Sequence, residues 1–118
     1  AAGSPEKGRS ALDGLVLTMH AVELHREHTP EGTRLHHTIT SGGGAANVVP
    51  EFAEGFFYVR HPKSEVVSKL YPRLVKCAEG GALATETKLE IQHLGGTLEI
   101  LPNDTLAEVT KGNLKSLN

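Results

Sequence analysis

The sequence has very little cysteine and no long hydrophobic run. Cys77 is the only cysteine among 118 residues, which excludes an internal disulfide and a zinc site built from several cysteines. A single cysteine fits a reducing compartment, so we predict a cytoplasmic protein. No apolar stretch approaches the ~20 residues that a membrane-spanning helix needs.

Positive charge is also sparse. The formal net charge is -2 with 7 histidines counted as neutral, and lysine and arginine form no run longer than two. Both observations argue against a nucleic-acid-binding surface. The hydrophobic share of 38% and the charged share of 22% are typical of a globular domain. Because the sequence lacks an initiator methionine, we expect these 118 residues to be a fragment of a longer polypeptide.

Two predicted strands flank a glycine-rich loop. Residues 33–40 alternate, with Leu35, His37 and Ile39 on one face and polar side chains on the other. This pattern predicts a half-exposed strand at the edge of a sheet. Residues 52–60 are apolar on both faces, which predicts a more interior strand.

The loop and the end of the second strand carry ligand-binding chemistry. Gly42, Gly43 and Gly44 permit positive φ and close backbone approach. Arg60 offers a planar five-donor fork that suits a carboxylate. We predict that the two strands bring this loop, the amide of Asn47 and the guanidinium of Arg60 to one region. The alternative is an ordinary glycine-rich loop and a solvated arginine.

Two helices are predicted on either side of this strand pair. The first covers residues 10–28, and its buried face is predicted from spacings of three and four to hold Leu12, Leu15, Val16, Met19 and Val22. The second begins at Ser64 as a cap, with a kink or break before Pro72, and its predicted buried stripe is Val67, Leu70, Leu74, Cys77 and Gly81.

Three histidines lie on or near the polar face of the first predicted helix. They are His20, His25 and His28, at spacings of five and three. Zinc ligands that share a helical face are usually three or four residues apart, so we interpret these histidines as solvated surface residues rather than a metal site.

The remaining residues complete an α+β order. We predict strands at residues 87–93 and 97–101, then a helix from Asn103 whose apolar side holds Leu106, Val109 and Leu114. The order predicts a ferredoxin-like two-layer sandwich, an antiparallel sheet with two helices on one face, that lacks its central first strand. Residues 97–101 or a neighbouring molecule would fill that gap. We divide the chain into a domain at 1–102 and a linker or further segment at 103–118.

Four ordered motifs resemble a known family over about residues 1–103. They read PEKGRSALD (5–13), GGAANVVP (43–50), YVR (58–60) and AEGGALATET (78–87). Together they resemble the lid, or dimerisation, domain of the dinuclear-zinc aminoacylase/carboxypeptidase family. Within that family the likeness is greatest to the branch of aminobenzoyl-glutamate hydrolases and related amidohydrolases.

The resemblance implies a division of labour between two domains. A separate catalytic domain would hold two zinc ions, or similar divalent metals, and cleave an N-acyl amino acid such as aminobenzoyl-glutamate. The metal-binding motifs of that domain are absent from these 118 residues, so this chain alone is expected to bind no metal and to catalyse nothing. The lid of the family also supplies a histidine to the active site, and its expected position falls just before Ala1.

Two substrate contacts carry over onto matching positions. Asn47 resembles the amide that contacts substrate near the reaction centre, and Arg60 resembles the guanidinium that clamps the free carboxylate; Gly43 and Gly44 complete the expected binding loop. The alternatives are that Asn47 satisfies its own turn and that Arg60 pairs with Glu54 or Glu65.

The resemblance further implies a homodimer. Its seam would join the edge strands of two lids beside the helix at residues 10–28, and the matching strand residues are Leu35, His36, His37, Thr38, Ile39 and Thr40. This agrees with the edge position predicted from alternation alone, because an unpaired strand can pair with another strand.

Two other functions remain open from the sequence. One is a free-standing ferredoxin-like regulatory module that binds an amino acid at a dimer seam, since this fold hosts many functions. The other is phosphate binding by Gly42–Gly44, which is the weaker alternative because no helix follows that loop.

Overall fold

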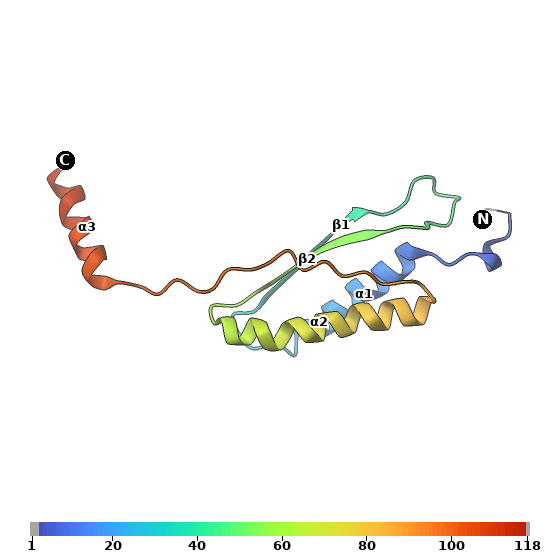
Figure 1. The fold of residues 1–118 in the computed structure, drawn as a ribbon, viewed down its shortest axis with the longest axis horizontal. Coiled ribbons are helices and arrows are strands. Elements are labelled where there is room, and N and C mark those ends of the chain that lie inside the picture. Colours follow the sequence, from blue (N-terminus) through green and yellow to red (C-terminus); the bar gives the residue numbers. More distant parts are fainter. Residues whose placement is uncertain (1–2, 118) are drawn as a thin grey trace.

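The structure, a computed structural model, describes residues 3–117. A 3₁₀ turn (Pro5–Lys7) leads into helix α1 (Ala11–Arg26), a hairpin of strands β1 (Arg34–Ser41) and β2 (Glu54–Arg60), and helix α2 (Ser64–Thr85). After an extended segment, helix α3 (Asp104–Ser116) ends the described chain. Figure 1 shows α1 and α2 side by side, with the hairpin beside them and α3 far away. None of these helices is long and apolar enough to cross a membrane.

The hairpin forms a two-stranded antiparallel sheet. Its register places Arg34 opposite Arg60 at one end and Ile39 opposite Gly55 near the other. A bulge follows at Thr40, whose hydroxyl donates to the backbone oxygen of Glu54 at 3.2 Å. Both strands begin or end within two residues of their predicted bounds. Because the side chains alternate, one face of the hairpin points at the helices and the other is open.

Both helices cover the same face of this sheet, which confirms the predicted α+β sandwich. Val22 of α1, Leu35 of β1 and Cys77 of α2 form the buried core, with Phe57 and Val59 of β2 packed against them. Helix α1 begins where Ser10 accepts a hydrogen bond from the backbone N–H of Asp13 at 3.2 Å. The helix therefore begins next to the predicted first residue, Ser10, and Ser4 precedes only the 3₁₀ turn.

The two helices pack through small residues. A Cβ added to Gly81 would lie 2.7 Å from the backbone oxygen of Gly14 and would also clash with the hydroxyl of Thr18. Gly14, Thr18 and Gly81 are all buried. The buried stripe of α1 therefore follows these small residues, and the prediction for Val16 was wrong because that side chain is 50% exposed.

Helix α2 runs without a break through Pro72, so the predicted kink or break before this proline does not take the form of a break. Leu70 and Cys77, on either side of the proline, are buried against the rest of the sandwich. This packing holds the helix together across the position where Pro72 lacks its N–H. Of the predicted buried stripe of α2, Leu70, Cys77 and Gly81 are buried, and Val67 and Leu74 are partly buried. Glu86 ends the helix in the left-handed conformation at φ 54°.

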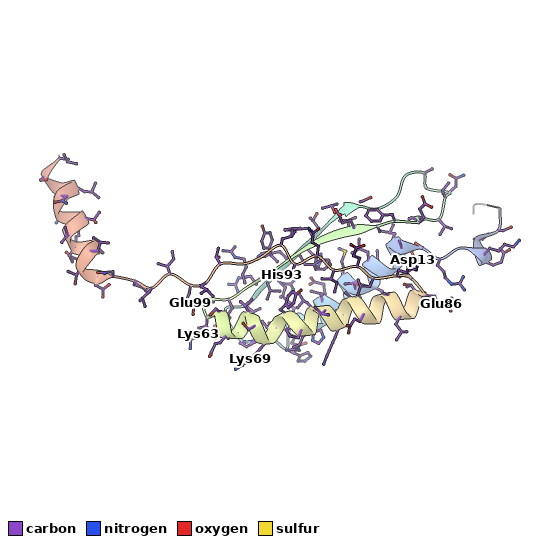
Figure 2. All side chains as sticks on the ribbon, viewed as in Figure 1. Asp13, Lys63, Lys69, Glu86, His93 and Glu99 are labelled. Carbon is purple, nitrogen blue, oxygen red and sulfur yellow. The ribbon has the colours of Figure 1, made fainter. Side chains whose placement is uncertain are left out.

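The predicted strands at residues 87–93 and 97–101 are not formed. The chain after α2 is extended but belongs to no sheet, and it runs back along α2. His93 stacks edge-on against Tyr71 at 5.3 Å between ring centroids, and the carboxylate of Glu99 accepts from the backbone N–H of Ser64 at 3.2 Å. Figure 2 shows Glu86 and Glu99 at opposite ends of α2.

The physical reason is that a strand needs a neighbour. In the ferredoxin-like order, the first strand lies between β2 and residues 87–93, and no described segment occupies that place. Residues 97–101 do not fill the gap either. For the same reason the predicted interior position of β2 is wrong for the described residues, because β2 pairs only with β1.

A carboxylate on α1 fastens the inner face of β1 to that helix. Glu23 accepts two hydrogen bonds from the guanidinium of Arg26, at 2.9 and 2.5 Å, and lies 2.8 Å from Nε2 of His37. The Arg26 hydrogen bonds, followed by the contact with His37, lower the pKa of Glu23 to about 2. Arg26 also donates to the backbone oxygen of Leu35 at 2.9 Å, so the cluster joins helix and strand directly.

We expect Gly81→Ala to destabilise the domain by about 1–3 kcal/mol, because the added methyl group overpacks the contact between α1 and α2. The matched control is Gly80→Ala, whose Cβ would meet nothing within 4 Å and should stabilise the helix by up to about 1 kcal/mol. Urea unfolding followed by circular dichroism measures both changes. Equal effects of the two variants would contradict the close packing.

We expect Glu23→Gln to lower the free energy of unfolding at pH 7 by about 0.5–1 kcal/mol, since the carboxylate is 44% exposed and solvent screens it. The pKa of Glu23 is lowered from 4.5 to about 2 by folding, so its stabilisation is present above pH 4.5 and lost as pH falls toward 2. The difference between wild type and variant should therefore shrink over that range. Glu79→Gln, at an exposed position of α2, is the control; a difference that is independent of pH would refute the assignment.

Candidate functional site

The loop between β1 and β2, residues 42–53, is closed on itself rather than free. Gly43 adopts φ +100°, and a Cβ there would lie 2.9 Å from Cγ of Pro50. The backbone oxygen of Pro50 accepts a hydrogen bond from the N–H of Ala11 at 2.9 Å, which ties the loop to the start of α1. Gly44 has open space where a side chain would be. The glycines therefore shape the loop and leave its outer surface open.

Asn47 stands exposed at the tip of this loop. The turn around it is closed by the backbone, where the N–H of Val48 donates to the oxygen of Ala45 at 3.1 Å. Within residues 3–117 the side-chain amide of Asn47 makes no hydrogen bond. The amide is thus available to a ligand, and the alternative in which Asn47 satisfies its own turn finds no support in these contacts.

Arg60 is exposed and lies at the end of β2 that is remote from the loop. No ion pair joins Arg60 to any carboxylate of residues 3–117. Glu54, one of the proposed partners, sits at the other end of the same strand and lies 2.5 Å from the hydroxyl of Thr40. The guanidinium of Arg60 is therefore available for a carboxylate outside this part of the chain.

The structure does not bring Asn47 and Arg60 together. Glu54 and Arg60 are six residues apart on β2, which at about 3.3 Å per residue separates them by roughly 20 Å. Asn47 lies beyond Glu54, in the loop, and Figure 1 shows the loop and the connection from β2 to α2 at opposite ends of the hairpin. The prediction that one chain delivers both groups to one region is wrong.

The open face of the hairpin carries three residues that were not predicted as site residues, Arg34, Phe56 and Tyr58. Arg34 lies opposite Arg60, and His36 lies opposite Tyr58. Phe56 and Tyr58 stack edge-on at 4.9 Å between ring centroids. The signal was present in the strand bounds, because an antiparallel hairpin pairs the first residue of one strand with the last residue of the other.

The six expected dimer-seam residues divide between the two faces of β1. Leu35 is 3% exposed in the core, and His37 points at Glu23 of α1, so these two offer only backbone groups to another strand. His36, Thr38 and Thr40 are exposed on the open face, and Ile39 is 40% exposed. Only one edge of β1 is paired within residues 3–117, so its other edge has free N–H and C=O groups.

The histidines of α1 do not gather into a metal site. His25 receives a hydrogen bond from Arg73 of α2 at 2.7 Å, and the same guanidinium donates to the backbone oxygen of His28 at 3.1 Å. His20 is exposed. In residues 3–117 no three histidine, cysteine, aspartate or glutamate side chains lie close enough to hold a metal ion. The donor groups of the described residues therefore do not form a site for the two metals that the resemblance implies for the catalytic domain.

Comparison with known proteins finds that the sequence is similar to parts of named hydrolases. The chain is 42% identical over 107 residues to one of the subunits of p-aminobenzoyl-glutamate hydrolase from Escherichia coli (strain K12), a match that covers 90% of this chain and 22% of that protein. It is 30% identical to Xaa-Arg dipeptidase of Mus musculus and 29% identical to Xaa-Arg dipeptidase of Homo sapiens, over 99% and 98% of this chain and 27% of each relative. The chain thus spans about a quarter of the length of these relatives.

The family match covers most of the sandwich. Residues 1–86, from the N-terminal segment to the end of α2, match the family described as Peptidase dimerisation domain. The two helices, the hairpin and its glycine-rich loop all fall inside this range. The chain belongs to the peptidase dimerisation domain family.

Proposed function

We propose that this chain is the dimerisation and substrate-capping domain of a metal-dependent hydrolase that cleaves N-acyl amino acids, with p-aminobenzoyl-glutamate as the leading substrate. The family match and the 42% identity to part of a hydrolase support the parent activity. The lone, buried Cys77 supports a cytoplasmic location. The observation that carries the proposal is the pair of exposed and unengaged polar groups, Asn47 and Arg60, at opposite ends of the hairpin.

The free edge of β1 supplies the dimer contact. Two copies of β1 related by a two-fold axis would pair antiparallel and extend the sheet to the order β2, β1, β1 of the partner and β2 of the partner. Helix α1 lies next to β1, because Glu23 of α1 contacts His37 of β1. The helix would therefore lie beside the seam. Main-chain hydrogen bonds give such a seam its affinity, and the buried side chains of Leu35 and His37 need not move.

This pairing would bring Asn47 of one subunit near Arg60 of the other, although the two residues are far apart within one subunit. In an antiparallel pair of β1 strands, the loop end of one hairpin lies beside the Arg60 end of the other. Asn47 of one subunit and Arg60 of its partner then face the same side of the seam. We therefore propose that each substrate is capped by two subunits, and that neither subunit alone completes a site.

The roles of the two groups follow from their chemistry. Arg60 binds the free carboxylate of the amino acid as a bidentate ion pair, which fixes the orientation of the substrate. Asn47 donates from its amide near the reacting carbonyl. The metals of the catalytic domain would supply an activated water for the amide bond. The capping domain contributes positioning and exclusion of bulk water as it closes.

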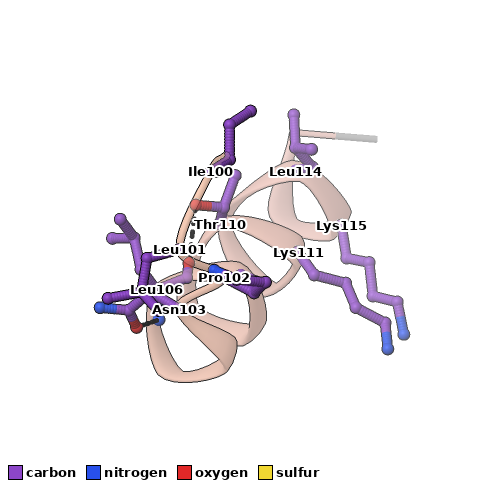
Figure 3. Close-up of a pocket in the computed structure, with 10 residues that line it drawn as sticks. Ile100, Leu101, Pro102, Asn103, Leu106, Thr110, Lys111, Leu114 and Lys115 are labelled. Carbon is purple, nitrogen blue, oxygen red and sulfur yellow. Dashed lines mark hydrogen bonds between the residues drawn. The ribbon is translucent and has the colours of Figure 1, made fainter. Parts of the chain in front are cut away.

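Helix α3 is proposed to connect this domain to the catalytic domain of the same polypeptide. Within residues 3–117, α3 contacts no other helix or strand. Its apolar side chains Leu106, Val109 and Leu114 are 55–61% exposed, and Figure 3 shows Ile100 and Leu101 beside this helix at an open hollow. An apolar stripe of this kind suits burial against another domain. The proposed boundary therefore lies near residue 103.

Co-expression of two impaired variants of the intact enzyme tests the two-subunit site. We expect Asn47→Ala and Arg60→Ala to reduce kcat/KM for p-aminobenzoyl-glutamate by about 10- to 100-fold each, as expected for loss of a hydrogen bond to a charged or polarised group. When both variants are expressed together, half of the dimers are mixed, and each mixed dimer has one intact site. Activity should return to about a quarter of wild type.

A linked double variant provides the control. Asn47→Ala/Arg60→Ala co-expressed with wild type should leave mixed dimers with no intact site if the two groups come from different subunits. If both groups came from one subunit, those mixed dimers would keep one intact site and the first experiment would restore nothing. That pattern would refute the two-subunit site, and full activity of Arg60→Ala would refute the carboxylate clamp.

A further inference from the structure

Two arginines face each other across the hairpin. Arg34 and Arg60 are register partners in the antiparallel pair, so their side chains leave the same face of the sheet. Both residues are exposed. Their Cα atoms are therefore about 4.5–5.5 Å apart, as in any directly opposed pair of an antiparallel ladder. Two guanidinium groups can reach the same ligand from these positions.

Like charges directly opposite each other destabilise a sheet. No carboxylate of residues 3–117 forms an ion pair with either Arg34 or Arg60. Glu31 and Glu65 are near in sequence and form no such pair either. One N–H of Arg34 donates to the backbone oxygen of Thr33 at 2.9 Å, which leaves most of its five donors free. The repulsion between Arg34 and Arg60 is thus not offset by any carboxylate of residues 3–117.

The positive charge of Arg34 and Arg60 lies at one end of the open face of the hairpin. The next opposed pair is His36 with Tyr58, and the next is Thr38 with Phe56. Tyr58 is 56% exposed and stacks on Phe56, so an aromatic surface follows the two arginines along the strands. The only carboxylate of β2, Glu54, is at the opposite end of the strand. A ligand that neutralises both arginines must therefore bring its own negative charges to this end.

We propose that Arg34 and Arg60 together form a subsite for a dicarboxylate, so that the capping domain selects N-acyl derivatives of acidic amino acids. The inference rests on the proposed function, in which Arg60 binds the α-carboxylate, and it assigns the side-chain carboxylate to Arg34. In the proposed dimer, β1 lies one strand nearer to the seam than β2, at a strand spacing of about 4.8 Å. Arg34 therefore lies between Arg60 and the loop of the partner subunit, within the same capped space.

The test compares two nearly isosteric substrates in the intact enzyme. They are N-(4-aminobenzoyl)-glutamate and N-(4-aminobenzoyl)-glutamine, which differ in charge at the side chain. We expect Arg34→Gln to lower kcat/KM for the glutamate compound by about 10- to 100-fold and to leave the glutamine compound within about twofold. Arg60→Gln should lower both. Arg9→Gln is the control and should change neither, since Arg9 pairs with Glu86 at the C-terminal end of α2, the end remote from Arg34 and Arg60.

The outcomes of this test separate the dicarboxylate subsite from the proposed capping function and its substrate class. If Arg34→Gln changes both substrates equally or neither, the dicarboxylate subsite is overturned while the capping function stands. If the wild-type enzyme hydrolyses neither compound, the proposed substrate class fails instead. The subsite is then judged by calorimetric titration with glutarate and with its monoamide: wild type should bind glutarate at least about 10-fold more tightly, and Arg34→Gln should abolish that preference. Equal affinities in wild type would overturn it.

Discussion

The antiparallel register of β1 and β2 is the constraint on which the rest of the site depends. It places Arg34 opposite Arg60 and leaves the loop with Asn47 at the far end of the hairpin. A strand is stiff and rises by a fixed step, so no side-chain rotation can bring the two ends together. A site that uses both ends must therefore combine two hairpins. In the proposed dimer, the pairing of two β1 strands is thus part of the binding chemistry.

The helices keep that hairpin in place from one side only. Gly14 and Gly81 let α1 and α2 approach closely, and the Glu23 cluster joins α1 to the inner face of β1. With both helices on this face, the open face and the free strand edges remain exposed to partners. The same asymmetry explains why a chain of 118 residues has so small a buried core, with Val22, Leu35 and Cys77 at its centre.

The sequence predicted helices well where the signal lies within the helix itself, in its apolar spacing or its capping residue. The spacing of Leu70 and Cys77 predicted the buried stripe of α2, and Asn103 caps α3 as expected, accepting from the N–H of Leu106 at 2.9 Å. Val16 was misplaced because hydrophobicity cannot reveal that α1 packs through Gly14 and Thr18. This packing depends on the facing helix as well, because α2 must also carry a small residue where the two helices touch.

Features that depend on a distant neighbour could not be predicted in this way. Residues 87–93 alternate as a strand should, yet they form none because the described chain offers no strand beside them. The roles proposed for Asn47 and Arg60 come from the family resemblance, whereas the separation of the two residues follows only from the register of the hairpin. Arg34 was overlooked for the same reason, because its proposed role depends on Arg60, which lies opposite it on β2.

The proposed two-subunit site requires that the free edge of β1 pairs with the same edge of a second copy. The most direct test is nuclear Overhauser contact between isotope-labelled and unlabelled copies mixed in one sample. We expect intermolecular contacts between β1 residues of the two copies, with the Arg34 end of one strand beside the Ser41 end of the other. Intermolecular contacts at the edge of β2 instead, or a monomer without any, would contradict the proposed pairing of β1 strands.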